Sequence, residues 1–214
     1  LLILEREYCM NNISFKQRVC QSIIDQSKIY KKVFIDRQYL ICSKCFTNRK
    51  YYILVASKDN YLHLVGVHTA LTPSEFFEKC FNDTLTENDF DFSKKNQSEK
   101  SVKGSVRRKI AALENINNFF AQDLYIEEGF RKNKVSCVIA TSDNKITIGF
   151  SEGIYSRPKT LLKGNMLNMS TNQIDLILSK EKNDKTFNKI EYGNEQILSY
   201  YHKDIYHLIS KNLI

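Results

Sequence analysis

The spacing of apolar residues changes period several times along this chain, and this change constrains the fold more than any other feature. In residues 14–32 apolar side chains recur near helical spacing from Phe15 to Tyr30, and Ser14 is placed to cap the first turn. Three short runs rich in Tyr, Ile, Val and Leu follow and predict an antiparallel meander: residues 38–46, 50–57 and 60–67. Helical and extended segments without regular alternation predict an α+β fold with a mainly antiparallel sheet.

A second helix start is visible at residues 71–75. Thr72 can cap a helix, Pro73 suits the first helical position, and Glu75 can reach back to complete a capping box. These three residue types in this order predict a short helix that ends near Asn82.

The rest of the chain continues the same mixture. Val102, Val106 and Ile110 recur at helical spacing, so we expect an amphipathic helix over residues 101–120 that covers the sheet. The other expected elements are a hairpin of strands 134–141 and 145–150 around a turn at 142–144, a weaker strand at 173–179 and a docking helix at 195–214.

A chain of 214 residues is long enough for one domain with its own core. We interpret residues 1–33 as an N-terminal helical segment, residues 34–193 as one α+β domain, and residues 194–214 as a C-terminal helix packed on that domain. Charged residues interrupt the apolar start of the chain at once, and no later stretch approaches the ~20 apolar residues of a membrane span. We therefore expect a cytoplasmic protein with no membrane contact.

The charge balance favours a polyanionic partner. The formal net charge is +8, with 32 Lys plus Arg against 24 Asp plus Glu. Such a surplus attracts nucleic acid through counterion release and long-range steering. The alternative is a merely solvated cationic surface, and net charge alone does not decide between them.

Common enzyme signatures are missing from the sequence. It contains no Walker loop, no dinucleotide glycine fingerprint, no Gly-x-Ser-x-Gly elbow and no His-Glu-x-x-His. Six scattered cysteines indicate reduced intracellular thiols. Cys42 and Cys45 form a CxxC in an apolar run without a second pair, which favours two core residues over zinc or redox chemistry. We expect no cofactor.

His63 is the first candidate for chemistry. If residues 60–67 form a strand, side chains alternate, and Tyr61, His63 and Val65 share one face. Histidine suits proton transfer because its unperturbed pKa is ~6.5. The alternative is a buried histidine satisfied by a backbone carbonyl.

The densest basic block lies on the helix expected over residues 101–120. Lys103 and Arg107 are four residues apart and would form one cationic stripe that can hold a phosphate. Lys100 and Arg108 are further candidate nucleic-acid contacts in this block. Solvent-exposed helix surfaces also have such runs of basic residues, so the alternative of a solvated surface without a ligand stays open.

A second basic segment, residues 156–165, contains no acid and is typical of a phosphate-binding loop. Its guanidinium, ammonium, hydroxyl and amide groups could all contact phosphate or sugar oxygens. The candidates are Ser156, Arg157, Lys159, Thr160, Lys163 and Asn165. A purely structural loop that leads into a strand is the alternative.

Together these residues suit metal-independent RNA cleavage, in which the 2′-hydroxyl attacks the adjacent phosphate. This reaction needs a proton-transfer group and cations on the phosphoryl oxygens. The candidate catalytic set is His63, Arg107, Arg157, Thr160 and Lys163. A metal site is the weaker idea, because Glu87, Asp89 and Asp91 alternate on a turn-rich segment without an accompanying histidine.

Several segments resemble, in order and spacing, a phage-encoded nuclease family of the Barnase/EndoU/colicin/RelE-like superfamily, of the PBECR type, fourth group. The resemblance extends over residues 34–193 and rests on these segments: residues 60–67 (NYLHLVGV), 74–80 (SEFFEKC), 85–92 (LTENDFDF), 103–110 (KGSVRRKI) and 157–165 (RPKTLLKGN).

The resemblance implies a small antiparallel sheet flanked by helices, with helices added at both ends. It also implies RNA cleavage or a toxin-like role in phages, mobile elements or bacterial hosts. The family's histidine motif falls on His63, whereas related sequences often have threonine where this chain has Val65. The other candidate catalytic residues rest on their chemistry and not on the resemblance.

Two alternatives belong to other functional classes. One is a nucleic-acid-binding module that kept the fold and the basic face without catalysis. The other is a phage or mobile-element protein that binds a host or inhibitory protein. Its candidate contacts are Tyr51, Tyr52, Phe76 and Phe77.

Overall fold

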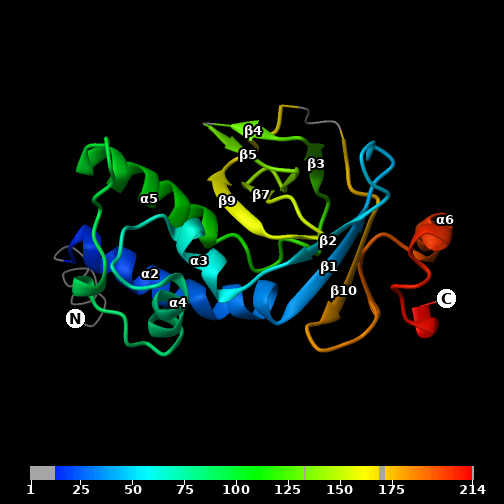
Figure 1. Cartoon of the computed structure of the whole chain (residues 1–214), viewed down its shortest axis with the longest axis horizontal. Helices are drawn as coiled ribbons and strands as arrows, with labels where there is room; N and C mark the ends of the chain where they lie inside the picture. Colours follow the sequence, from blue (N-terminus) through cyan, green and yellow to red (C-terminus); the bar gives the residue numbers. More distant parts are fainter. Residues whose placement is uncertain (1–12, 133, 169–171, 214) are drawn as a thin grey trace, which may run out of the picture.

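The computed structural model describes residues 13–132, 134–168 and 172–213. The protein is α+β, with five α-helices in the described residues and mostly antiparallel sheets. Figure 1 shows helices α2, α4 and α5 at one end, α3 beside strand β9, and α6 at the opposite end beyond the sheets. The expected fold class is confirmed.

The larger sheet has five strands in the order β11-β10-β1-β2-β8. All neighbours are antiparallel except β2 and β8. The strands are β1 Arg37–Cys42, β2 Tyr52–Val55, β8 Tyr155–Ser156, β10 Leu176–Glu181 and β11 Lys189–Tyr192. The first two expected strands of the meander are thus confirmed and pair with each other, and the strand expected at 173–179 begins three residues later.

The second sheet has four antiparallel strands in the order β3-β6-β7-β9. They are β3 Tyr125–Glu128, β6 Ile139–Ser142, β7 Ile146–Phe150 and β9 Pro158–Lys163. The hairpin turn between β6 and β7 lies where it was expected, with Asn144 at φ 72°. The extended segment before the turn is divided, since β5 (Val135–Ser136) pairs separately with β4 (Arg131–Lys132).

Two helix starts form as the sequence predicts. Helix α2 (Phe15–Tyr30) is capped by Ser14, whose hydroxyl accepts a hydrogen bond of 3.0 Å from the backbone amide of Gln17. Helix α4 (Pro73–Phe81) begins at Thr72 with its capping box complete. A five-residue π-helix, Lys31–Ile35, continues α2, and a 3₁₀ turn, Glu87–Asp89, follows α4.

The third expected strand, residues 60–67, is wrong, because residues 60–65 lie in helix α3 (Lys58–Val65) and Gly66 ends that helix. The amide of Ser57 donates to Asn60 Oδ1 at 2.9 Å at the helix start. Tyr61, Leu64 and Val65 are buried, and their spacing of three and four residues fits one face of a helix, whereas in a strand Leu64 would lie on the face opposite to Tyr61 and Val65. Short apolar runs permit both periods, and here packing decided for the helix.

Helices α5 and α6 end earlier than their apolar patterns indicate. Helix α5 (Glu99–Leu113) starts at the Ser98 cap and ends seven residues before 120, although Ile116 and Phe120 remain buried. Asparagines at 115, 117 and 118 favour turns, because their side chains compete for backbone groups. Helix α6 is Glu195–Ile205, and a 3₁₀ turn, Lys211–Leu213, lies near the chain end.

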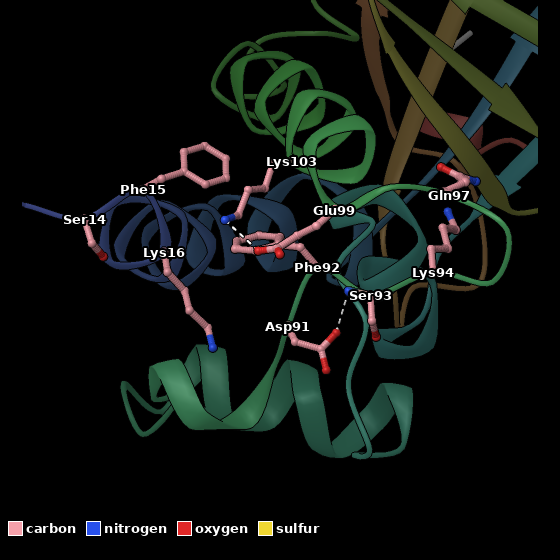
Figure 2. A pocket seen from close by; sticks show the side chains of 10 residues that line it. All are labelled: Ser14, Phe15, Lys16, Asp91, Phe92, Ser93, Lys94, Gln97, Glu99 and Lys103. Carbon is pink, nitrogen blue, oxygen red and sulfur yellow. Dashed lines mark hydrogen bonds and ion pairs between the residues drawn. The ribbon is translucent and has the colours of Figure 1, made fainter.

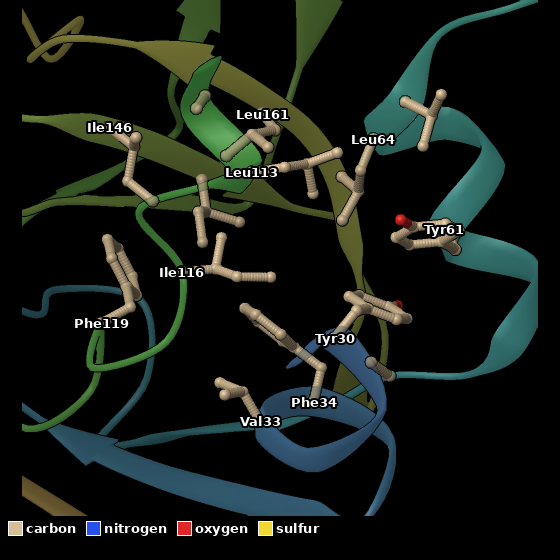
Figure 3. Close-up of a cluster of buried hydrophobic side chains, with 14 of the residues drawn as sticks. Tyr30, Val33, Phe34, Tyr61, Leu64, Leu113, Ile116, Phe119, Ile146 and Leu161 are labelled. Atoms are coloured by element: carbon tan, nitrogen blue, oxygen red, sulfur yellow. The ribbon is translucent and has the colours of Figure 1, made fainter. Parts of the chain in front are cut away.

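One large hydrophobic core joins helices α2, α3, α4 and α5 to both sheets. Figure 3 shows Tyr30 of α2 packed toward Tyr61 and Leu64 of α3, with Leu113 of α5 and Leu161 of β9 beside them. Each of these side chains is fully or almost fully buried. A second core cluster packs α6 on the other face of the five-stranded sheet. The first core fixes α3, α5 and β9 relative to one another.

Burial corrects the residues proposed as contacts for a protein partner. Tyr52, Phe76 and Phe77 are each at most 1% exposed, so their rings belong to the core. Only Tyr51 of that set is partly exposed. The aromatic residues in question therefore do not form a docking surface.

The CxxC is not a core pair. Cys42 is buried, whereas Cys45 is exposed beyond the end of β1.

None of the helices in the described ranges has both the length and the apolar character that a membrane-crossing helix requires.

Candidate functional site

Helices α3 and α5 and strand β9 form a junction in which each element packs on the other two. Leu64, Leu113 and Leu161 belong to the core that joins them. Two segments singled out from the sequence, around His63 and in residues 156–165, therefore lie on elements that contact each other. We call this place the α3–α5–β9 junction.

His63 lies in the last turn of α3 with its side chain exposed. The interpretation as a buried, satisfied histidine is therefore wrong. Among the described residues, the imidazole has no hydrogen-bond or ion-pair partner. A solvent-facing imidazole can exchange protons with a bound ligand.

Lys109 extends from α5 to the end of α3. Its ammonium donates a hydrogen bond to the backbone carbonyl of His63. Burial and the nearby positive charge of Lys94 lower the pKa of Lys109 to about 8. At neutral pH this lysine still holds most of its charge.

Gly66 lets Lys109 reach this position. It ends α3 in the left-handed region at φ +80°, where a side chain is strained. A Cβ at Gly66 would lie 2.8 Å from Lys109 Cδ. The absence of a side chain at Gly66 therefore allows both the left-handed turn and the close approach of the Lys109 side chain.

The basic segment 156–165 is mostly a strand and not a loop. Residues 158–163 form β9, so the loop prediction is wrong there. Arg157 is exposed between β8 and β9, and Lys163 is exposed at the end of β9. Lys159 donates to the backbone carbonyl of Ser136 at 2.8 Å, which occupies one of its three donor hydrogens.

The polar groups of this segment differ in exposure. Ser156 and Thr160 are 0% and 7% exposed, so their hydroxyls are in the interior. The Asn165 side chain donates to Asn144 Oδ1 at 2.9 Å and accepts from the amide of Leu167 at 3.1 Å, which holds a turn. Among the six candidates here, Arg157 and Lys163 are the most available cations, and their roles stay predictions.

On the other flank of α5, Lys103 and Arg107 face α2. The ammonium of Lys103 is 2.6 Å from a carboxylate oxygen of Glu99 and lies over the Phe92 ring, while the guanidinium of Arg107 lies over the Phe15 ring at 5.1 Å. The sequence placed Arg107 with His63, but the structure turns Arg107 toward α2 and Lys109 toward α3. Lys100 and Arg108 are exposed.

A cavity of about 600 Å³ lies on the α2 flank (Figure 2). Its charged lining is mixed: Lys16, Lys94 and Lys103 with Asp91 and Glu99. We call this the α2–α5 cavity. Internal pairs already occupy Lys103 and Glu99, so much of its charge is balanced by the protein itself.

A histidine that the sequence reasoning did not select lies beside this cavity. His68 Nδ1 is 3.2 Å from Asp91 Oδ1 and 3.1 Å from Ser93 Oγ, and the backbones of His68 and Asp91 are hydrogen-bonded to each other. The hydroxyl and amide of Ser93, and then His68, lower the pKa of Asp91. An ionised Asp91 favours a proton on Nδ1 and leaves Nε2 as the acceptor.

The acidic run of residues 87–91 does not form a cluster of metal ligands. In the described ranges, no three His, Cys, Asp or Glu side chains are grouped as metal ligands. Asp89, from the acidic run noted in the sequence, instead accepts from Lys79 at 2.5 Å and from Thr86, and these contacts lower its pKa. Asp89 thus holds the turn after α4.

Comparison with known proteins identifies one family. The family model described as phage-Barnase-EndoU-ColicinE5/D-RelE like nuclease 4 (PBECR4) matches residues 22–205. The match starts within α2 and ends with the last residue of α6, so it is longer than the resemblance seen over residues 34–193. No curated protein and no solved structure matches the chain.

Proposed function

Because the chain belongs to the phage-Barnase-EndoU-ColicinE5/D-RelE like nuclease 4 family, we propose that it is a ribonuclease that cleaves RNA without a metal ion at the α3–α5–β9 junction. One observation supports this place above others. The imidazole of His63 is exposed, and the backbone carbonyl of the same residue accepts a hydrogen bond from the Lys109 ammonium. Helices α3 and α5, which hold these two residues, both pack against the basic strand β9.

The proposed chemistry uses the nucleophile that RNA itself supplies. His63 takes the proton of a 2′-hydroxyl, the 2′ oxygen bonds to phosphorus, and the bond from phosphorus to the 5′ oxygen breaks. The protonated imidazole returns the proton to the departing 5′ oxygen. The products are a 2′,3′-cyclic phosphate and a 5′-hydroxyl.

Exposed cations would hold the RNA during this step. Arg157 can offer two parallel donors to phosphoryl oxygens, and Lys163 adds a point charge farther along β9. Lys100 and Arg108 on α5 are candidate contacts for neighbouring phosphates. Positive charge that neutralises the phosphates makes binding depend on salt.

The test compares an RNA and a DNA of the same sequence, each incubated with the protein in EDTA. We expect cleavage of the RNA alone and 2′,3′-cyclic phosphate ends, because DNA lacks the attacking hydroxyl. Cleavage of both substrates, or cleavage only after Mg²⁺ is added, would contradict the proposed mechanism.

A second candidate function is RNA binding without cleavage. The observation that favours it is the ring of His63, which has no orienting partner among the described residues, unlike His68 with Asp91. Catalytic histidines are commonly oriented by a second group. Tight, salt-dependent binding of RNA with no product after prolonged incubation would support this candidate. A toxin-like role and an inhibitory protein partner remain predictions.

A further inference from the structure

Lys109 is a lysine in an unfavourable place. Its side chain is half-buried, desolvation and the positive charge of Lys94 lower its pKa, and no carboxylate in the described ranges pairs with its ammonium. Burial of a charge is costly unless the charge is paired or hydrogen-bonded. The hydrogen bond that this ammonium makes to a backbone carbonyl is therefore informative.

That contact is with the end of α3. The last carbonyls of a helix lack partners within the helix, and cations are favourable there. In α3 the amide of Gly66 donates to the Leu62 carbonyl at 2.9 Å, and Lys109 donates to the next carbonyl, that of His63. The lysine thus binds the backbone of the residue whose imidazole faces solvent.

The aliphatic part of Lys109 adds a second restraint. It lies across Gly66, where the chain leaves α3. The helix has only eight residues, so its last turn depends on outside contacts more than that of a long helix. Lys109 holds this turn from two directions.

We propose that Lys109 is the positioning residue of His63: by binding the His63 carbonyl and covering Gly66, it fixes the last turn of α3 so that the imidazole is held at the junction with β9. This inference rests on the proposed function at the same junction. It differs from a direct phosphate contact by Lys109, and from a role in stability alone.

Enzyme kinetics on RNA in EDTA separate these roles. Lys109→Met removes the donor but keeps the aliphatic length, Lys109→Arg keeps a cationic donor, and Lys185→Met removes an exposed lysine elsewhere as the matched control. We expect Lys109→Met to lower kcat about 10- to 100-fold and to leave KM within about threefold, since loss of orientation acts on the chemical step. Lys109→Arg should recover most of kcat, and Lys185→Met should match the wild type.

Two kinetic outcomes would overturn the inference. An unchanged kcat in Lys109→Met would show that the contact does not position His63. A raised KM with normal kcat would show that Lys109 binds the phosphate directly. If Lys109→Met does not fold, Lys109→Gln, which retains a polar donor without charge, should show a reduced kcat of the same kind with KM maintained, and normal kcat in this variant would equally overturn it.

A readout without cleavage distinguishes this inference from the proposed function. The chain has four histidines, and NMR of their ring carbons, with His63 assigned from His63→Gln, reports each one. In Lys109→Met the His63 signal should shift or broaden, while those of His68, His202 and His207 stay unchanged. An unchanged His63 signal would refute the positioning role even if the protein cleaves no RNA. Normal cleavage by His63→Gln would instead refute the proposed site.

Discussion

The two flanks of α5 treat their cations differently. On the α2 flank, Lys103 pairs with Glu99 and lies over Phe92, and Arg107 lies over Phe15. On the α3 flank, Lys109 has a backbone carbonyl and no acid in the described ranges. The same helix thus combines an ion-paired lysine and an arginine that lies over an aromatic ring with a lysine that has no acidic partner in the described ranges.

This difference indicates where a polyanion has most to gain. A phosphate that approaches Lys103 must compete with the carboxylate of Glu99, which is already paired with it. Arg157 and Lys163, at opposite ends of the strand that packs on α3 and α5, are exposed cations without an ion pair in the described residues, so a phosphate meets no such competitor there. Dense positive charge in a sequence is therefore not the same as available positive charge in a structure.

The largest effect in this comparison should appear in RNA binding. Replacing both Arg157 and Lys163 by Met should weaken RNA binding about tenfold or more at moderate salt and reduce the salt slope by about two, because two phosphate contacts are lost. Lys103→Met is the matched variant on the α2 flank and should change affinity by less than about threefold, since its ammonium is already paired. Filter binding across a salt series measures both. Equal losses of RNA affinity in the two proteins would contradict the proposed difference between the cations on the two flanks.

A smaller effect should appear in the pH dependence of stability. The pKa of Lys109 is about 8 in the folded protein against 10.5 for an unperturbed lysine. At pH values between these two pKa values, Lys109 binds more protons in the unfolded chain than in the folded protein. The contribution of Lys109 to the free energy of unfolding therefore rises with pH. The wild type should therefore gain stability relative to Lys109→Met as pH rises from about 8 towards 10.5.

Denaturant unfolding of both proteins across this range gives the difference directly, because other titrating groups are common to both. A difference that stays constant with pH would mean that Lys109 titrates normally and that its ammonium is not withdrawn from water. The contrast between the flanks would then lose its electrostatic basis.

The helix starts could be predicted from the sequence because their signals are local. Ser14 and the Thr72–Pro73–Glu75 cap each act within one turn, and both helices begin there. The hairpin turn at Asn144 was predicted for the same reason. Local hydrogen-bonding chemistry determines these features, and distant residues change them little.

Features that depend on packing could not be predicted in this way. Residues 60–67 fit both a strand and a helix, and burial of Tyr61 and Leu64 against α2 and β9 decided the outcome. The end of α5 was also predicted wrongly. Buried apolar residues continue at helical spacing as far as Phe120, although the chain leaves the helix after Leu113 and forms turns. Hydrophobic spacing indicates which residues are buried better than it indicates the conformation that buries them.

The candidate site was predicted only in part for a similar reason. His63 and the basic segment can be selected from residue type, but nothing in the sequence distinguishes Lys109 from the neighbouring lysines, because its contact with the His63 carbonyl depends on the fold. The pairing of His68 with Asp91 joins residues 23 apart and has no sequence signature. Long-range contacts of this kind require the fold.

We propose that His63, and not the better-oriented His68, transfers the proton. The most direct test is kcat/KM on one RNA in EDTA for His63→Gln and His68→Gln, with melting temperatures measured in parallel. We expect His63→Gln to lose about 10²- to 10⁴-fold and His68→Gln to lose less than about threefold, with both proteins folded. A large loss in His68→Gln together with near-normal cleavage by His63→Gln would contradict this account and move the reaction to the α2–α5 cavity.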